Sequence, residues 1–220
     1  MASVLGGLKN KSVLDVGCGS SEYHKWSVVC GAKVFGVDIS VEMVKLGYDR
    51  VKSVEWIAAD ALYLPFKDGA FDISMTFQAL HHFPNWKKAL IEMLRTSKAI
   101  SLFEPNRNNF FHRLMDSIRL IFRVEKRFKQ VQENYKLVEP YAQGFSPIVL
   151  IRFLEEKGVR CKLFMSGILP ASLLRIFFRL SPRLVYSVLT IENLIQRIPI
   201  LRSQLGGFLL IGWKQNDAQK

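Results

Sequence analysis

A glycine-rich turn between two short apolar runs constrains the fold more than any other feature of the sequence. The first run and its turn are residues 13–20, VLDVGCGS, and the second run, residues 34–37, ends at Asp38. Two β-branched runs separated by a helical stretch predict a β-α-β crossover. Gly17 and Gly19 let the backbone pass close under a ligand, and a carboxylate after the next strand can accept both ribose hydroxyl protons. These residues therefore predict a nucleoside-binding unit.

Acidic side chains around the turn narrow the choice of nucleoside. Asp15 lies just before the turn, and Glu22 stands where a dinucleotide fingerprint has its third glycine. Two carboxylates here would repel a pyrophosphate, because they would compete with it for the positive N-terminal end of the helix. The same carboxylates suit a ligand that carries an ammonium and a sulfonium. We therefore predict S-adenosylmethionine as the cofactor.

Further motifs follow the turn in a fixed order. Asp60 comes directly after a third short run, residues 54–57, and is followed by residues 64–75 and then by residues 79–83, ALHHF. In this order, residues 11 to about 105 resemble the class I S-adenosylmethionine-dependent methyltransferases. Residues 13–20 are similar to motif I of that family, and Asp38 matches its acidic residue after the second strand. Asp60 matches the Asp that accepts a hydrogen bond from the adenine amino group.

The resemblance implies a set of cofactor-binding residues. Two features of the set stand out: Cys18 is expected as a small filler beside the cofactor, and Tyr23 either reaches the methionine end or packs within its helix. Ser21 departs from the family, which often has a third glycine there, so the affinity or shape of the cofactor site can differ. The implied residues are Asp15, Gly17, Cys18, Gly19, Tyr23, Asp38, Ile39, Asp60, Ala61, Phe77 and Gln78.

Strand and helix patterns alternate through the first half of the chain, which is typical of a doubly wound α/β fold. The resemblance implies a Rossmann-like, seven-stranded sheet of order 3-2-1-4-5-7-6, with an antiparallel last strand at residues 208–213 beside residues 159–164. With 220 residues, 49% of them hydrophobic, we expect residues 1–220 to form a single domain. The expected strands are 12–16, 33–37, 54–57, 71–76 and 98–103, and the expected helices are 22–30, 41–49 and 86–95.

The three cysteines are scattered without the spacing of a metal site, so we predict no metal and a reduced, intracellular protein. The formal net charge is +12, and basic side chains are concentrated in the second half of the chain. Such a charge attracts nucleic acid, anionic membranes or acidic substrates.

Two helical insertions are predicted in the second half, at residues 107–130 and 166–200. The first is a basic amphipathic helix, and the second is more apolar. Neither has an uncharged run near the roughly 18 residues that a spanning helix needs. Because the first strand begins at residue 12, we expect the insertions to roof the substrate site in place of N-terminal helices. Their arginine-edged apolar faces also suit the interface of an anionic membrane, and one helix can do both.

Candidate catalytic residues follow the fourth and fifth expected strands. Methyl transfer from a sulfonium requires mainly an in-line arrangement, and a base is needed only when the acceptor carries a proton. His81 and His82 match a recurrent histidine pair of the family, and Glu104 ends the fifth strand. The alternatives are that the histidines pack or cap a helix, and that Glu104 bonds the loop backbone or pairs with Arg107.

The preferred function is methyl transfer to a small, lipophilic or membrane-associated acceptor. Residues 76–79 read TFQA, which lacks the Asn/Asp-Pro-Pro-aromatic motif of enzymes that methylate the amino groups of DNA bases. A tRNA or RNA methyltransferase that uses the basic helices is the first alternative, although no RNA-binding module is visible. A cofactor-binding protein without catalysis is the second. We expect a cytoplasmic protein that binds peripherally to the inner face of the membrane, and we leave the oligomeric state open.

Overall fold

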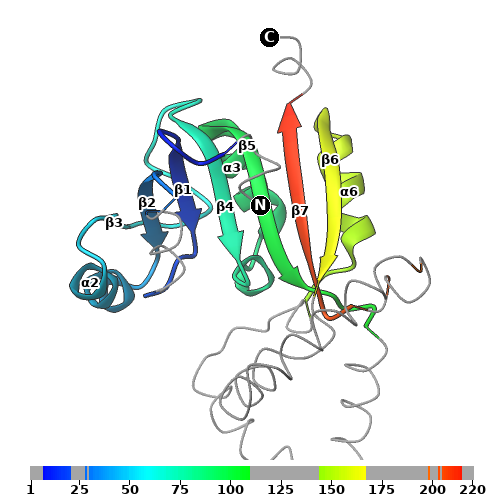
Figure 1. The fold of residues 1–220 in the computed structure, drawn as a ribbon, viewed down its shortest axis with the longest axis horizontal. Helices are drawn as coiled ribbons and strands as arrows, with labels where there is room; N and C mark the ends of the chain where they lie inside the picture. Colours follow the sequence, from blue (N-terminus) through cyan, green and yellow to red (C-terminus); the bar gives the residue numbers. More distant parts are fainter. Residues whose placement is uncertain are drawn as a thin grey trace, which may run out of the picture.

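The computed structural model describes residues 7–20, 28, 30–109, 144–166, 198, 203 and 205–214. Figure 1 shows the order of the elements along the chain. The strands are β1 (Ser12–Val16), β2 (Lys33–Asp38), β3 (Glu55–Ala58), β4 (Phe71–Phe77), β5 (Ser97–Pro105), β6 (Val159–Ser166) and β7 (Gly207–Lys214). The helices are α2 (Val41–Arg50), the 3-10 helix η1 (Leu80–His82), α3 (Trp86–Thr96) and α6 (Pro147–Glu155).

Within the described residues, seven strands form one sheet in the order β3-β2-β1-β4-β5-β7-β6. Neighbouring strands from β3 to β5 pair in parallel, and β7 runs antiparallel to both β5 and β6 (Figure 1). The predicted Rossmann-like fold and strand order are confirmed, and the predicted strand bounds differ from the observed ones by at most two residues at either end. Most of the predicted helix 22–30 lies outside the described residues.

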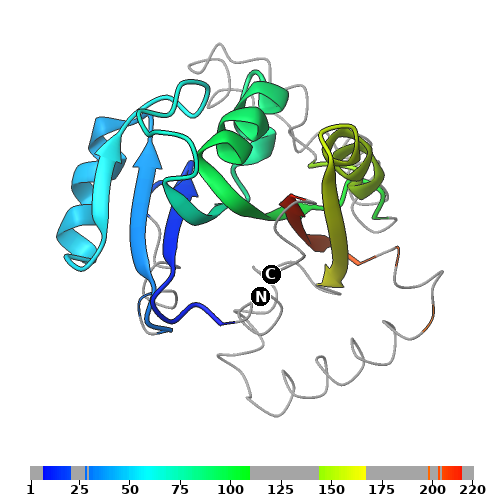
Figure 2. The ribbon, with the colours of Figure 1, turned by 90° about the horizontal axis from the view of Figure 1, so that it is seen from above.

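Alternating side chains of the strands pack on opposite faces of the sheet. Leu14 and Val16 of β1 join the main core with α3 and α6, whereas Val13 packs in a second cluster on the other face. Figure 2 shows α3 and α6 on the same side of the sheet. Helix α2 contacts β2 and β3, where Gly47 leaves room for the Trp56 ring. The core that carries the site is therefore an α/β sandwich.

Side-chain caps explain where two of the helices begin. The Ser40 hydroxyl accepts a hydrogen bond from the Met43 N–H at the start of α2, and the Asn85 side chain accepts one from the Lys88 N–H at the start of α3. Both satisfy a backbone donor that has no partner inside the helix. Helix α6 was not predicted. Pro147 in its first turn is a helix-start signal, but its β-branched residues weaken the helical pattern, and the helix packs against β6 and β7.

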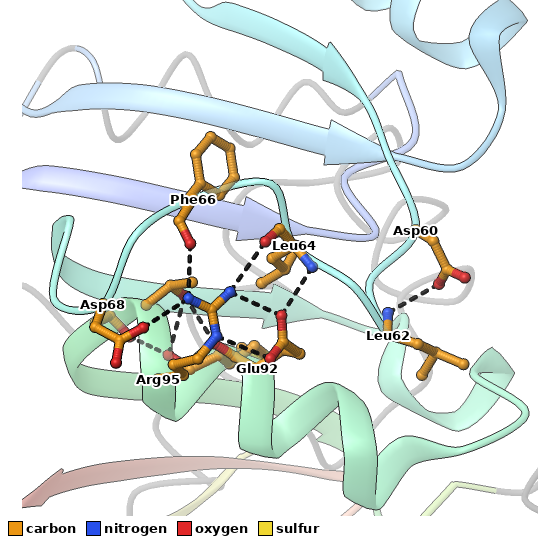
Figure 3. A network of polar contacts seen from close by, with 10 residues as sticks. Asp60, Leu62, Leu64, Phe66, Asp68, Glu92 and Arg95 are labelled. Atoms are coloured by element: carbon orange, nitrogen blue, oxygen red, sulfur yellow. Dashed lines mark hydrogen bonds and ion pairs between the residues drawn. The ribbon is translucent and has the colours of Figure 1, made fainter.

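Arg95 of α3 holds the loop between β3 and β4 in place (Figure 3). Its guanidinium donates hydrogen bonds to the Phe66 and Leu64 carbonyls at 2.7 and 3.0 Å and to the Asp68 carboxylate at 2.8 Å. Glu92 accepts from Arg95 and, at 2.9 Å, from the Leu64 N–H. The hydrogen bond from Arg95 lowers the pKa of Glu92, and both carboxylates raise the pKa of Arg95. This network positions the loop that carries Asp60.

The Asn106 side chain links the end of β5 to the segment just before β7. This buried side chain donates hydrogen bonds to the Ser203 and Leu205 carbonyls at 3.0 and 2.8 Å. The end of β5, the end of β6 and the start of β7 therefore lie together, at the bottom of Figure 1. Most of the predicted insertions, 107–130 and 166–200, lie outside the described residues, which include only their first residues, 107–109 and 166, and residue 198. No helix among the described residues is long and apolar enough to cross a membrane.

Candidate cofactor and acceptor site

The turn after β1 needs glycine at two positions for different reasons. Gly17 and Gly19 have φ angles of +72° and +53°, a left-handed conformation that other residues adopt at a cost. A Cβ on Gly17 would lie 2.8 Å from Ala79 Cβ and from Phe83 Cζ, so this glycine lets the turn pack against the segment after β4. A Cβ on Gly19 would meet no atom of the described residues within 4 Å. Within the described part of the chain, the backbone at Gly19 therefore faces open space.

Asp38 closes the turn from the neighbouring strand. Its Oδ2 accepts a hydrogen bond from the Gly19 N–H at 2.7 Å, and its Oδ1 accepts one from the Ser40 N–H at 2.9 Å. Each carboxylate oxygen can accept a second hydrogen bond, so capacity for two ribose hydroxyls remains. The next residue, Ile39, is 74% exposed, an unusual amount for a large aliphatic side chain. Carboxylate and apolar surface thus lie side by side, as an adenosine requires.

Asp60 lies at the end of the adjacent strand. The Ala59 N–H donates to the Asp38 carbonyl at 3.0 Å, which extends the pairing of β2 and β3 towards Asp60. Asp60 Oδ1 accepts from the Leu62 N–H at 2.8 Å (Figure 3). Ala61, between them in the sequence, is half-buried. The turn after β3 therefore brings Asp60 to the same edge of the sheet as Asp38.

Two acidic side chains, Asp15 and Asp38, lie close to Cys18 of the turn. Asp15 is 1% exposed, and the Cys18 side chain beside the turn is buried. Burial, and then the charges of Asp15 and Asp38, raise the pKa of the Cys18 thiol far above its usual range. Cys18 is therefore a neutral thiol that donates to the Gly19 carbonyl at 3.4 Å, which agrees with a filling role. The Asp15 and Asp38 charges that contribute to this shift also favour a bound sulfonium over a pyrophosphate.

The segment after β4 has a strained backbone at Gln78. Its φ angle is +53°, which is uncommon for a residue with a Cβ, and its N–H donates to the Phe103 carbonyl at 2.7 Å. The Phe77 and Phe103 rings stack with centroids 4.6 Å apart and planes 8° apart. This geometry holds the chain at the ends of β4 and β5 in one defined conformation, next to the cofactor turn.

Glu104 is a fully buried carboxylate with three hydrogen-bond contacts. Its Oε1 accepts from the Ala79 and Leu80 N–H groups at 3.2 and 2.9 Å, and its Oε2 lies 2.6 Å from His81 Nδ1. The structure therefore shows the loop-bonding arrangement that was one of the alternatives for Glu104. His81 is buried, whereas His82 is exposed with its ring centroid 4.0 Å from that of His81.

The structure brings most of the predicted site residues to one edge of the sheet. Tyr23, together with Ser21 and Glu22, lies outside the described residues. Sequence reasoning missed Arg95 and Glu92, which hold the loop of Asp60, because an i, i+3 charge pair on a helix usually indicates only a solvated face. Among the described residues, no group of three or more His, Cys, Asp or Glu side chains could hold a metal ion.

Comparisons with known proteins agree with this geometry. The family model described as "Methyltransferase domain" matches residues 14–101. A demethylmenaquinone methyltransferase from Listeria welshimeri is 35% identical over 183 residues, which cover 68% of this chain and 75% of the relative. The chain belongs to the class I S-adenosylmethionine-dependent methyltransferases. S-adenosylmethionine is the cofactor of this family, as the charges around the turn predicted.

Other relatives and solved structures support the fold of this methyltransferase. A demethylmenaquinone methyltransferase from Renibacterium salmoninarum is 35% identical over 98 residues, and the match spans 44% of this chain and only 41% of that relative. The S-adenosylhomocysteine-bound magnesium protoporphyrin IX methyltransferase from Synechocystis has a TM-score of 0.62 at 14% identity, covering 97% of this chain and 81% of that one. A methyltransferase from Methanosarcina mazei has a TM-score of 0.63 at 17% identity, covering 97% of both chains.

Proposed function

We propose that the protein transfers a methyl group from S-adenosylmethionine to a lipophilic ring acceptor of the quinol type. The observation that carries this proposal is the 35% identity over 183 residues to a demethylmenaquinone methyltransferase. The TFQA sequence at residues 76–79 supports it, since an enzyme for base amino groups would present a different motif there. Half-buried aromatic side chains at the ends of β4 and β5 also suit an apolar ring.

In this proposal the edge of β1, β2 and β3 binds the cofactor. Asp38 accepts the two ribose hydroxyls through the oxygens that already hold Gly19 and Ser40. Asp60 accepts from the adenine amino group, and Ile39 and Ala61 contact the adenine ring. Asp15 and the peptide groups of the turn from Gly17 to Gly19 lie under the methionine end, where buried negative charge favours the cation. We propose that Tyr23, Phe77 and Gln78 make further contacts with the methionine end of the cofactor.

His81 is the proposed base for the acceptor hydroxyl. An ionised Glu104 carboxylate can only accept hydrogen bonds, so its 2.6 Å contact places the proton of a neutral His81 on Nδ1. The His81 Nε2 lone pair then remains available to take the acceptor proton. Glu104, which is fully buried, acts through His81 and the loop as a positioning residue. His82 remains a second candidate base because it is exposed beside His81.

When bound, S-adenosylmethionine would supply an activated methyl group for the electron pair of the acceptor. The protein's part is to align the two partners and to remove the acceptor proton. Alignment alone supplies roughly 7 to 11 kcal/mol at best. The stacked Phe77 and Phe103 and the strained Gln78 fix the conformation of the chain between the cofactor turn and His81.

The same proposal gives the two insertions, 107–130 and 166–200, the role of a lid over the acceptor or of a surface that rests on an anionic membrane. The support is that Asn106 holds their attachment points at the edge of the sheet where the site lies. The protein would then work in the cytoplasm, peripherally on the inner face of the membrane.

Labelled methyl transfer tests this function directly. The protein is incubated with methyl-labelled S-adenosylmethionine and either a prenylated demethyl-naphthoquinol in detergent micelles, total tRNA, or no acceptor. We expect label in the naphthoquinol alone. Label in tRNA would replace the proposal with an RNA methyltransferase that uses the basic segments. Cofactor binding without transfer to any acceptor, including lipid and small-molecule extracts, would leave a cofactor-binding protein.

A further inference from the structure

Four half-buried apolar side chains form a row across four neighbouring strands. Phe77 of β4 pairs with Phe103 of β5, Phe103 pairs with Leu209 of β7, and Leu209 pairs with Phe164 of β6. Side chains of residues that pair directly project to the same face of a sheet. The pairing is continuous along all three strand pairs, so the four residues, here called the aromatic row, share one face.

The aromatic row lies on the face opposite α3 and α6. Ile100 and Leu102 of β5 belong to the core cluster that includes Leu90 of α3 and Leu154 of α6. Because successive residues of a strand alternate, Phe103 projects to the other face. Figure 2 shows α3 and α6 together on one side of the sheet. Helix α2 packs on the face of the aromatic row, but over β2 and β3, whereas the row lies on β4, β5, β7 and β6.

The inner end of the aromatic row adjoins the cofactor site. Phe77 is the last residue of β4, and the following residue, Gln78, donates to the Phe103 carbonyl. Two residues before Phe77, Met75 pairs with Asp15 of β1, which lies under the cofactor turn. In the proposed function the acceptor approaches the methyl group from this end, which puts the Phe77–Phe103 stack next to the reacting atoms.

The outer end of the aromatic row reaches β6, the last strand of the sheet order. Three inter-strand spacings of about 4.8 Å give a row roughly 14 Å long, more than a single ring covers. Lys162 and Arg160 share the face of Phe164 on β6 and are exposed, and Lys162 Nζ lies 5.4 Å from the Phe164 ring centroid. These cations disfavour a cationic ligand at this end and leave an apolar or acidic one.

We propose that the aromatic row binds a linear apolar tail of the acceptor, with the acceptor ring over Phe77 and Phe103 and the tail running across Leu209 to Phe164. The occupant is thus an amphiphile with one planar ring and one extended apolar chain. This inference rests on the proposed function, because that function sets the end from which the ring is methylated. It adds to that function the expectation that the acceptor binds more tightly with a longer tail, up to the length of the row across the four strands.

Two substitutions at the outer end test the row without touching the cofactor turn. Leu209→Ala and Phe164→Ala remove tail contacts, and Leu163→Ala is the matched control because Leu163 projects to the opposite face and is 37% exposed. The probes are 1,4-naphthoquinone and the same ring with a three-prenyl side chain, added to the full-length protein with S-adenosylhomocysteine. Binding is measured by quenching of tryptophan fluorescence, and thermal melts verify that each variant is folded.

We expect the tailed probe to bind the native protein more tightly than the tail-less probe. Each row variant weakens the tailed probe by about tenfold and leaves the tail-less probe unchanged, and Leu163→Ala changes neither. Equal affinity of the native protein for the two probes overturns the inference, as does an equal response of the row variants and the control. Row-dependent binding without labelled methyl transfer would overturn the proposed function and leave the row intact.

Discussion

The two halves of the sheet build their parts of the site by different means. In the first half, carboxylates at the ends of β2 and β3 accept hydrogen bonds from backbone N–H groups two residues away, as Asp38 does from Ser40 and Asp60 does from Leu62. In the second half, the site depends on pairings between distant segments, such as Phe103 with Leu209. Polar contacts of the local kind are readable from sequence spacing, whereas an apolar row across strands exists only once the sheet has formed.

The largest expected effect is a loss of catalysis without a loss of cofactor binding, and it is expected at Glu104, where the two halves of the sheet meet. In Glu104→Gln, the amide that faces His81 becomes a donor, so the His81 proton moves to Nε2 and the proposed base is lost. We expect kcat to fall by about 100-fold or more while the affinity for S-adenosylmethionine stays unchanged. Single-turnover methyl transfer and calorimetry measure the two quantities. An unchanged kcat, or a loss confined to His82→Gln, would contradict the assignment of His81.

In the second half, we expect Asn106→Ala to cost about 2–4 kcal/mol of unfolding free energy. The substitution leaves the Ser203 and Leu205 carbonyls without their side-chain donor and opens a small cavity at a position that is 2% exposed. Urea denaturation measures the loss. Asn108→Ala at an exposed neighbouring position is the control, and equal stabilities of the two variants would show that Asn106 does not hold this junction.

In the first half, Asp38→Ala should weaken cofactor binding by about 1.5–3 kcal/mol, because a carboxylate acceptor for two hydroxyl groups is removed. Calorimetric titration with S-adenosylmethionine gives the change. Asp49→Ala in α2 is the matched control, since Asp49 is exposed and pairs with exposed Lys52 at 3.1 Å. Unchanged affinity in Asp38→Ala would refute the role of Asp38 as the ribose acceptor.

A smaller effect tests the Arg95 network through pH. The pKa of Glu92 is lowered in the folded protein, chiefly by the hydrogen bond from Arg95. The charged form is therefore favoured by folding, so its stabilisation is present above the ordinary glutamate pKa of about 4.3 and is lost as pH falls through the lower folded value. Glu92→Gln should be less stable than the native protein by about 1 kcal/mol near pH 7. The difference in urea midpoint should shrink below pH 4; a constant difference would contradict this account.

The smallest effect concerns a buried hydroxyl in the middle of the sheet. Among the described residues, Thr76 Oγ1 has no hydrogen-bond partner although the side chain is fully buried. Thr76→Val keeps the shape and removes the desolvated hydroxyl, so we expect a gain of up to about 1 kcal/mol in unfolding free energy. Thermal unfolding shows the change as a higher midpoint. A lower midpoint would mean that the hydroxyl stabilises β4.

Much of the fold was predictable because its signals are local. The bounds of β1 and α2 follow from apolar runs, from the turn at Gly17 to Gly19 and from the Ser40 cap, all of which act within a few residues. Helix α6 was missed, although Pro147 in its first turn is a local helix-start signal. Its β-branched residues weaken that signal, and burial of Leu150 and Leu154 in the core supports the helix.

By itself, the sequence predicted the cofactor, because a glycine turn and spaced carboxylates act over short distances along the chain, and its resemblance to the methyltransferase family implied the strand order. The tertiary structure alone decided the partner of Glu104, 23 residues away at His81, and the contact of Asn106 with Ser203, 97 residues away. It also decided the aromatic row. Such contacts depend on strand register and on which face each side chain meets, and no spacing along one segment encodes either.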